Sequence, residues 1–170
     1  MTFTSPLPAT DPLPIAPERA MLASWLDAFR ADLLSKLNGL TEGQADQRLL
    51  PSLTTLHGLV RHLTKVEHVW FVQVLAGLTE AAPYGWPEKR TGDFELTGSA
   101  GLDADVASFV AAIERSRQIA AGQSLDDVRH HHRLGDVSVR WVLQHVISEY
   151  AQHCGHADIV RELIDGTTMS

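Results

Sequence analysis

The sequence predicts an all-α fold, an up-down-type four-helix bundle with a long loop between its second and third helices. Four segments carry apolar residues at steps of three and four, and a glycine follows each of them. No stretch of useful length alternates apolar and polar residues as a strand does. The chain of 170 residues is 44% hydrophobic and 21% charged, so we expect a single domain over residues 1–170 with one buried core.

The charge balance excludes two classes of partner. The net charge of −7 argues against a basic surface for nucleic acid, and no polybasic segment is available for an anionic membrane. No apolar run approaches the roughly 20 residues that span a bilayer, and the first residues lack the charged and apolar regions of a signal peptide. The single cysteine, Cys154, excludes an internal disulfide. We therefore expect a soluble cytoplasmic protein that binds neither nucleic acid nor membrane.

The chain begins with an irregular arm, because residues 1–16 hold four prolines among small residues. The first helix begins near Pro17 and ends near Gly39. Its buried stripe consists of Leu22, Trp25 or Leu26, Phe29, Leu33 and Leu37. A polar connection follows, with a short helical turn around residues 42–48.

The second helix covers about residues 54–76, between a threonine N-cap and a glycine. Its buried face consists of Leu56, Leu59, Val60, Leu63, Val66, Trp70 and Val74. His62 lies on or beside this face. His57 and His68 project elsewhere, so we expect them at the surface or at its boundary.

A long ordered loop is predicted over residues 78–101, because a flexible linker would not carry the three aromatic residues Tyr84, Trp86 and Phe94. Tyr84 and Trp86 either pack within this loop or cover the mouth of a pocket. The third helix then covers about residues 102–121.

The connection after the third helix contains three consecutive histidines, His130, His131 and His132. Adjacent side chains point in different directions, so this run predicts a solvated connection rather than a metal site. The tryptophans Trp70 and Trp141 are expected in packed positions.

The fourth helix covers residues 138–165, and a glycine ends it. It carries His145, Glu149 and His153 at steps of four residues, which places them within an arc of about 80° at roughly 100° per residue. His156 falls inside the same arc. Imidazoles and a carboxylate that share one face of a mostly apolar helix indicate a divalent metal ion.

A three-residue ligand set follows from this spacing. Glu149 and His153 lie one helical turn apart, so their side chains converge on one ion. His62 is the histidine elsewhere that occupies a buried helical position, and it would be the third ligand. Three nitrogen or oxygen ligands leave a coordination position open, as catalytic sites do. From the residues alone, hydrogen-bonded boundary residues at helix contacts explain the pattern equally well.

Two blocks of the sequence resemble a known superfamily. They are H-L-x-x-V-E-x-x-W-F within residues 59–71 and E-Y-A-x-H-x-G-H-A-D within residues 141–162. Both are similar to the DinB-like or YfiT-like four-helix-bundle metalloenzymes, and most similar to an actinobacterial-type subgroup related to mycothiol-dependent enzymes. The resemblance extends over the chain from the first helix to Gly166.

The resemblance implies a metal centre with His62, Glu149 and His153 as its ligands. Many superfamily members have histidine at the position of Glu149, and the carboxylate resembles the mycothiol-dependent maleylpyruvate isomerase type. Zinc is the expected metal, with nickel and manganese left open. The implied reaction is that of a transferase or isomerase. A low-molecular-weight thiol such as mycothiol, activated as a metal-bound thiolate, would attack a small-molecule electrophile. Pairing of two copies into a homodimer is also implied.

The remaining side chains of the last helix receive secondary roles. His145 and His156 are expected to contact the thiol cofactor or to support the ligands, with a surface position as the alternative for His156. Cys154 points about 100° away from His153 and is expected to pack as a small apolar residue. No catalytic residue is assigned. Two alternatives remain: a hydrolase that uses metal-bound water, and a non-enzymatic protein that binds a metal or a small molecule.

Overall fold

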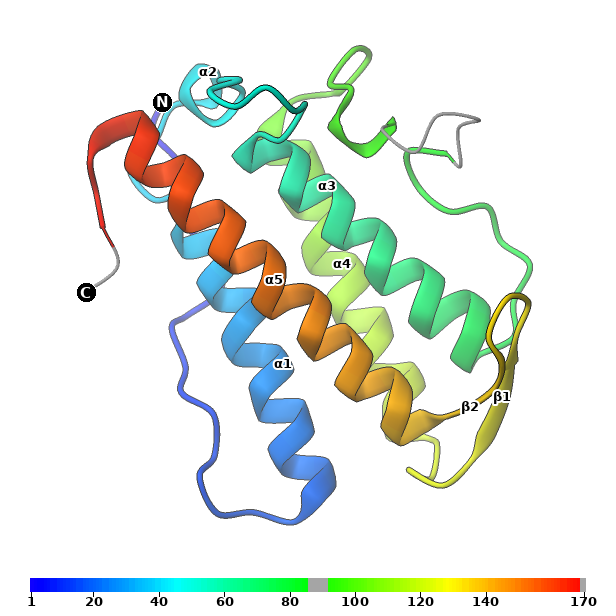
Figure 1. Cartoon of the computed structure of the whole chain (residues 1–170). Helices are drawn as coiled ribbons and strands as arrows, with labels where there is room; N and C mark the ends of the chain where they lie inside the picture. The colour runs from blue at the N-terminus through cyan, green and yellow to red at the C-terminus, as the bar shows by residue number, and fades with distance from the viewer. Residues whose placement is uncertain (86–91, 169–170) are drawn as a thin grey trace.

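Four long helices and a small β-hairpin form the protein (Figure 1). The computed structural model describes residues 1–85 and 92–168. The long elements are α1 (Glu18–Ser35), α3 (Leu56–Glu67) with its π-helical continuation η1 (His68–Leu75), α4 (Leu102–Ala121) and α5 (Val139–Asp165). The short elements are α2 (Glu42–Ala45), the 3₁₀ turn η2 (Gly92–Phe94), β1 (Val128–His131) and β2 (Gly135–Ser138). The predicted four-helix bundle is confirmed.

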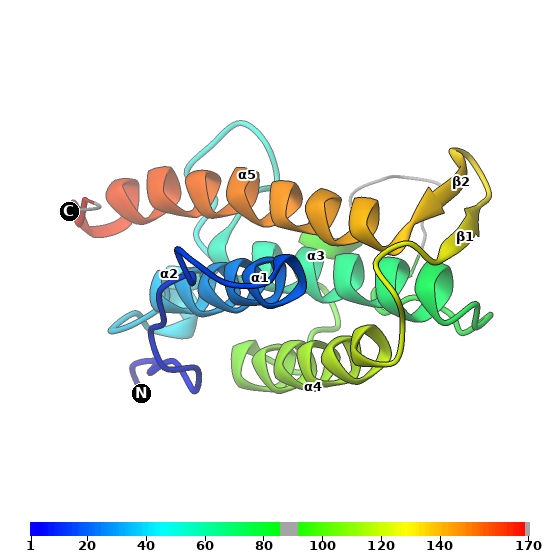
Figure 2. The same cartoon turned by 90° about the horizontal axis from the view of Figure 1, so that it is seen from below.

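The long loop after η1 connects two helices that start at the same end of the bundle. Figures 1 and 2 show that α3 and α4 run in the same direction, whereas α1 and α5 run in the opposite one. The chain must therefore return along the length of the bundle before α4 begins. α5 packs against α1 and α3, and α4 packs against α3. No helix among the described residues is long and apolar enough to cross a membrane.

Local capping chemistry sets the ends of the helices that carry the site. Ser138 caps α5 by accepting a hydrogen bond from Trp141 N, and Gly166 ends that helix in the left-handed conformation with φ of +76°. Thr55 caps α3 through Gly58 N. The prediction for the first helix was too long at its C-terminus: α1 ends at Ser35, and Gly39 follows after a turn.

A buried polar triad joins three of the helices at the centre of the bundle. Arg30 of α1 donates to both carboxylate oxygens of Glu67 at 2.8 and 3.0 Å, and Tyr150 of α5 donates to Glu67 Oε1 at 2.7 Å. All three side chains are buried. Burial raises the pKa of Tyr150 well above its usual value. Because every partner is satisfied, the triad fixes α1, α3 and α5 relative to one another.

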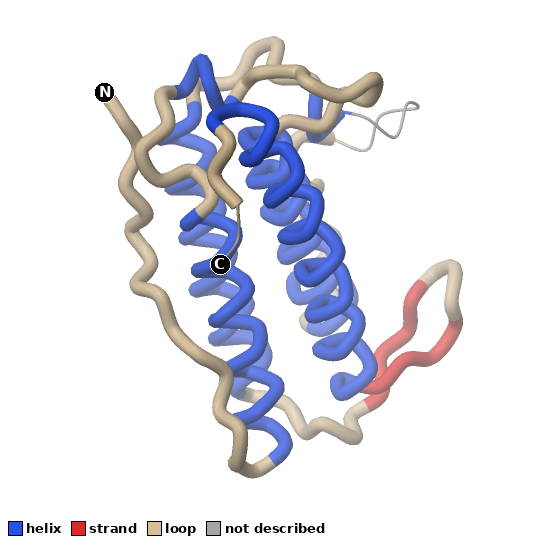
Figure 3. The backbone as a smooth tube through the Cα atoms, turned by 60° about the vertical axis from the view of Figure 1, so that its left-hand side comes forward, coloured by secondary structure: helices blue, strands red, loops and turns tan. Residues whose placement is uncertain are grey.

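The segment after α4 departs most from prediction. The run His130–His132 was expected in a solvated connection, but β1 and β2 pair as an antiparallel hairpin, drawn in red in Figure 3. His131 at the end of β1 is buried and lies flat against Trp70, with ring centroids 5.0 Å apart. Strands of four residues are too short for alternation to reveal them.

Two further expectations about burial were wrong. His57 is only 1% exposed, although we expected it at the surface or its boundary. Trp141 was expected in a packed position but is 39% exposed. Of the two alternatives for the buried stripe of α1, Leu26 takes the buried position and Trp25 is exposed. The second helix is also not one α-helix, because its last two turns widen into the π-helical η1.

Candidate functional site

Three ligand-type side chains converge between α3 and α5. The donor atoms of His62, Glu149 and His153 all lie within 4.8 Å of one another. His62 Nε2 lies 4.0 Å from Glu149 Oε2, and His153 Nε2 lies 3.6 Å from the same oxygen. Glu149 and His153 share a face of α5 because they are one helical turn apart. Packing of α3 against α5 then brings His62 opposite them.

The other nitrogen of His62 is held by a buried carboxylate. His62 Nδ1 lies 3.0 Å from Asp93 Oδ2, and Lys65 Nζ donates to Asp93 Oδ1 at 2.7 Å. Burial opposes ionisation of Asp93, but the hydrogen bonds with His62 and Lys65 outweigh it and hold its pKa below its usual value. An ionised Asp93 accepts the Nδ1 proton, so the lone pair of His62 is on Nε2, which faces Glu149.

A glycine of α3 allows the η2 turn to deliver Asp93. A Cβ atom at Gly58 would lie 2.6 Å from Cδ1 of Phe94, so only glycine permits this approach. Phe94 in turn stacks on the imidazole of His62, with ring centroids 5.5 Å apart. Gly58 and Phe94 therefore help to place Asp93 and to restrict the His62 ring.

These residues fit a divalent metal ion. His62 Nε2 is buried and has no hydrogen-bond partner within residues 1–85 and 92–168, which is costly unless a ligand completes the site. Glu149 is held ionised, because its contact with His153, aided by the charges of His145 and His62, lowers its pKa. Two imidazole nitrogens and a carboxylate form a donor set that suits zinc and leaves a coordination position open.

The two other histidines of α5 differ in position. His156 is exposed, and its Nδ1 lies 3.3 Å from His153 Nδ1, on the side of that ring away from Glu149. A His153 Nδ1–H donated to His156 would leave His153 Nε2 available for a metal ion. His145 Nε2 lies 3.5 Å from Glu149 Oε1, and its ring stacks on Trp141. The geometry therefore favours His145 over His156 for contact with a thiol cofactor.

A pocket of about 920 Å³ extends from this cluster toward the hairpin. Its lining comes from α3 and η1 on one side, α5 on the other, η2 and the hairpin turn: His62, Lys65, Val66, Val69, Trp70, Gln73, Val74, Asp93, His130, His131, His132, Arg133, Leu134, Trp141, His145 and Glu149. Along α5 the lining from Glu149 to Trp141 covers about 12 Å at roughly 1.5 Å per residue. The volume is within the range of sites for organic ligands.

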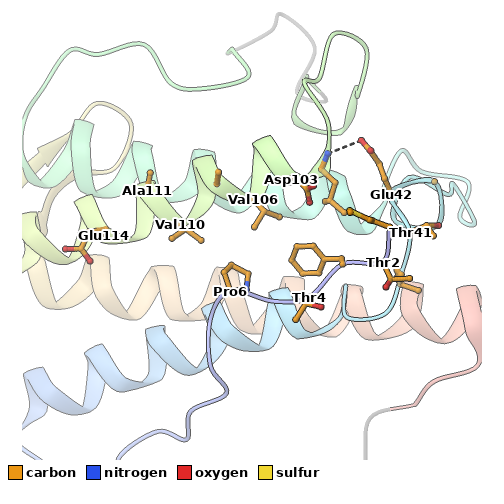
Figure 4. A pocket seen from close by; sticks show the side chains of 16 residues that line it. Thr2, Thr4, Pro6, Thr41, Glu42, Asp103, Val106, Val110, Ala111 and Glu114 are labelled. Carbon is orange, nitrogen blue, oxygen red and sulfur yellow. Dashed lines mark hydrogen bonds between the residues drawn. The ribbon is translucent and has the colours of Figure 1, made fainter.

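A second pocket of about 840 Å³ lies between the N-terminal arm and α4 (Figure 4). Its wall includes Thr4 and Pro6 of the arm and Val106 and Val110 of α4. Glu42 closes one end by accepting a hydrogen bond from Leu102 N at 2.9 Å. No histidine or cysteine lines this pocket, so the chemistry available places the candidate site in the other one.

Other predicted residues lie away from the cluster. Tyr84 does not line the pocket: its hydroxyl donates to Asp105 Oδ1 at 3.0 Å, and its ring covers Arg61, whose guanidinium carbon is 4.3 Å from the ring centroid. Trp86, which was also considered for the pocket mouth, lies outside the described residues. Cys154 is buried against α1, and burial raises the pKa of its thiol far above the usual value.

Sequence patterns predicted neither Asp93 nor the π-helical turn that presents Trp70. One signal was available for Asp93, because a glycine within a strongly patterned helix, here Gly58, often marks close approach of another segment. Nothing local indicated η1. Trp70 lies edge-on to His145, with ring centroids 4.5 Å apart, and it is also stacked on His131. Widened turns of this kind are frequent at functional sites.

Two comparisons with known proteins address the family of the chain. A search of the curated proteins gave no match. The family model described as mycothiol-S-transferase matches residues 21–166, which include both blocks that resembled the DinB-like superfamily and every residue of the cluster. Since the match covers more than half of the chain, the predicted family is confirmed, and the chain belongs to the mycothiol-S-transferase family.

Proposed function

We propose that the protein binds a divalent metal ion, zinc in the first instance, through His62, Glu149 and His153, and transfers mycothiol to a small electrophile. The family supports the thiol and the reaction class. One observation carries the metal site: His62 Nε2 is buried, unpartnered among the described residues, and directed at Glu149. An unsatisfied nitrogen in this position is costly without a ligand.

The side chains around the proposed metal site have different roles. Asp93 fixes the tautomer of His62, and the helical spacing of α5 aligns Glu149 with His153. A bound divalent cation would lower the pKa of a coordinating thiol, so that the thiol reacts as thiolate at neutral pH. His145 lies in the pocket beside Glu149 and is placed to accept the proton that the thiol loses.

The nucleophilic sulfur has to come from the co-substrate. Cys154 is the single cysteine, and it is buried with its Sγ 3.6 Å from the carbonyl oxygen of Phe29. Its raised pKa keeps it a thiol at neutral pH. The Cys154→Ala variant is therefore expected to keep the conjugating activity of the wild type, and native protein should react slowly with a disulfide reagent.

The direct test is metal analysis of the wild type beside His153→Ala, with mycothiol conjugation measured on both. We expect about one zinc per wild-type chain, loss of most of this metal in the variant, and loss of conjugation with it. His68→Ala is the control, because His68 is a histidine at the start of η1 that does not line the pocket. A wild-type protein that purifies without metal and cannot take up zinc would refute the proposal.

A metal-dependent hydrolase is the second candidate, favoured by a specific observation. His145 Nε2 lies 3.5 Å from Glu149 Oε1 within the pocket, where it could equally take a proton from water. Cobalt substitution separates the two functions, because thiolate coordination changes the visible spectrum strongly. If mycothiol leaves the spectrum of the cobalt protein unchanged while ester or amide substrates are cleaved, the hydrolase is the better description.

A further inference from the structure

The hairpin end of the pocket carries a permanent positive charge, although the protein as a whole is acidic. The chain has a net charge of −7, and residues 129–133 read Arg-His-His-His-Arg. His130 to Arg133 line the pocket beyond the cluster of His62, Glu149 and His153, and Arg133 is the permanently charged residue among these four. A cationic side chain at the pocket wall favours anionic ligands there.

Arg133 is the permanent charge of this run that is free to act. Arg129 is engaged, because its Nε donates to the carbonyl oxygen of Leu75 at 3.0 Å and another of its nitrogens lies 3.5 Å from Asp127. The guanidinium of Arg133 has no hydrogen bond or ion pair with any residue in the described part of the chain. Lys65, the other cation of the lining, is bound to Asp93.

The turn that carries Arg133 is held by a buried histidine. His131 Nδ1 accepts hydrogen bonds from the backbone nitrogens of Arg133 and Leu134, both at 3.2 Å. The His131 ring is stacked on Trp70, so the turn is fixed to η1 and therefore to the pocket wall. Burial keeps the pKa of His131 below its usual value, which suits a neutral ring that accepts these bonds.

Aromatic rings line the part of the pocket between Arg133 and the cluster of His62, Glu149 and His153. Trp141 is stacked on His145 at 4.9 Å with an interplanar angle of 9°, and Trp70 meets both of them at steeper angles. Trp141 is 39% exposed, so part of its surface is available to a ligand. Aromatic side chains favour flat conjugated groups, which stack on them or meet their edges.

We propose that the pocket selects a planar, conjugated electrophile that carries a carboxylate or similar anion, with the anion bound by Arg133 and the flat body against the rings of Trp70, Trp141 and His145. This inference rests on the proposed function, since it names the acceptor of the thiol. An electrophile held in this way extends from the hairpin toward Glu149. In that orientation its reactive carbon lies toward the end of the pocket formed by His62, Glu149 and His153, where the thiol sulfur of the co-substrate would be bound.

A balanced reaction for such an acceptor is aromatic substitution. The thiol sulfur forms a bond to the ring carbon, the carbon–chlorine bond breaks, chloride leaves, and the thiol proton passes to a base and then to solvent. The matched acceptors are 4-chloro-3-nitrobenzoate, which is anionic, and 4-chloro-3-nitrobenzamide, which is neutral and has nearly the same shape. No oxidant or reductant is required.

The experiment compares Arg133→Gln with wild type on both acceptors, using the zinc-loaded protein and mycothiol. For the benzoate we expect kcat/KM to fall about tenfold, mostly through KM, because the charge-assisted hydrogen bond to the carboxylate is lost. For the benzamide we expect less than a twofold change. Arg48→Gln is the control, since Arg48 is an exposed arginine outside both pockets.

A binding measurement keeps this inference separate from catalysis. Without thiol, 3-nitrobenzoate should quench the tryptophan fluorescence of wild type at lower concentration than 3-nitrobenzamide, and Arg133→Gln should abolish the difference. If nitrobenzoate binds in an Arg133-dependent way but no acceptor is conjugated, the proposed function fails and the anion subsite stands.

Two outcomes would overturn the anion subsite. In the first, conjugation proceeds but Arg133→Gln affects both acceptors equally or neither of them. In the second, nitrobenzoate binding survives Arg133→Gln and is lost in metal-free His153→Ala, which would place the carboxylate on the metal ion instead.

Discussion

Two histidines five positions apart on α3 illustrate how packing separates a structural imidazole from a functional one. His57 is 1% exposed and has a carboxylate on each ring nitrogen, Asp46 at 2.7 Å and Asp105 at 2.8 Å. His62 has a carboxylate on one nitrogen only, and its other nitrogen faces Glu149 across 4.0 Å without a hydrogen bond. Both are histidines of one helix with acidic neighbours, and of the two only His62 has a ring nitrogen without a hydrogen-bond partner among the described residues.

The difference lies in what surrounds each ring rather than in the ring itself. Around His57 both ring nitrogens are hydrogen-bonded, and Asp105 also accepts hydrogen bonds from Ser99 and Tyr84. Such a closed network connects α3 to α4 and stabilises their packing. Around His62 the network is open on the side of the pocket. A buried imidazole nitrogen without a partner costs folding free energy, and a bound cation would recover it.

The largest effect expected from this comparison is the loss of metal affinity in His62→Ala. Removal of one of three protein ligands should weaken zinc binding roughly 1,000-fold, if the ligands share the 10–16 kcal/mol typical of structural zinc sites. The measurement is competition with a zinc chelator. His57→Ala should retain the wild-type affinity, and an equal loss in both variants would end the distinction drawn between the two rings.

For the stability of the metal-free protein, we expect the opposite order of the two variants. His57→Ala leaves the carboxylate of Asp105 buried and without its imidazole partner, so we expect the free energy of unfolding to fall by about 3 kcal/mol. Urea denaturation of metal-free protein measures it. His62→Ala should lose less, about 1.5 kcal/mol in the same assay, because only one of its ring nitrogens is hydrogen-bonded and Asp93 keeps its ion pair with Lys65.

A smaller effect is expected when the support of His62 is changed and the ligand is kept. Asp93→Asn should lower zinc affinity about tenfold, within the range typical of groups that orient a metal-bound histidine. The amide can present its NH₂ group to Nδ1 and so favour the wrong tautomer of His62. Wild-type affinity in this variant would mean that Asp93 serves only to dock the η2 turn.

The smallest expected effect is a pH dependence of the free energy of unfolding, which arises from the hydrogen-bonded network around His57 and Asp105. Burial opposes ionisation of Asp105, but hydrogen bonds from Ser99, His57 and Tyr84 outweigh it, so its folded pKa lies below 3.8. As pH falls, the unfolded chain therefore takes up this proton first. The contribution is complete above about pH 4 and is lost as pH falls through the folded pKa. Metal-free Asp105→Asn should show a flatter acid limb in urea denaturation than wild type.

Much of the fold could be predicted because it depends on neighbours along the chain. The ends of α5 at Ser138 and Gly166 follow from a side-chain cap and a left-handed glycine, both local effects. The alignment of Glu149 with His153 likewise needs nothing beyond the helical repeat. The same holds for α4, whose predicted limits agree with the structure.

The supporting groups of the site could not be predicted in this way. Asp93 reaches His62 from 31 residues away, in a loop without periodicity, and Asp105 reaches His57 from 48 residues away. The strands of the hairpin are four residues each, too short for a pattern, and η1 differs from an α-helix only in its hydrogen bonds. Each of these depends on which segments pack together.

The sequence by itself therefore determined the four long helical segments and the alignment of Glu149 with His153, because helix periodicity and capping act within a few residues. Two sequence blocks indicated the family. Tertiary structure decided that both ring nitrogens of His57 are hydrogen-bonded and that one ring nitrogen of His62 is not. It also placed Arg133 at the pocket. The physical reason is that a buried polar group is defined by its partners, and those partners come from distant segments whose contact is established only when the bundle packs.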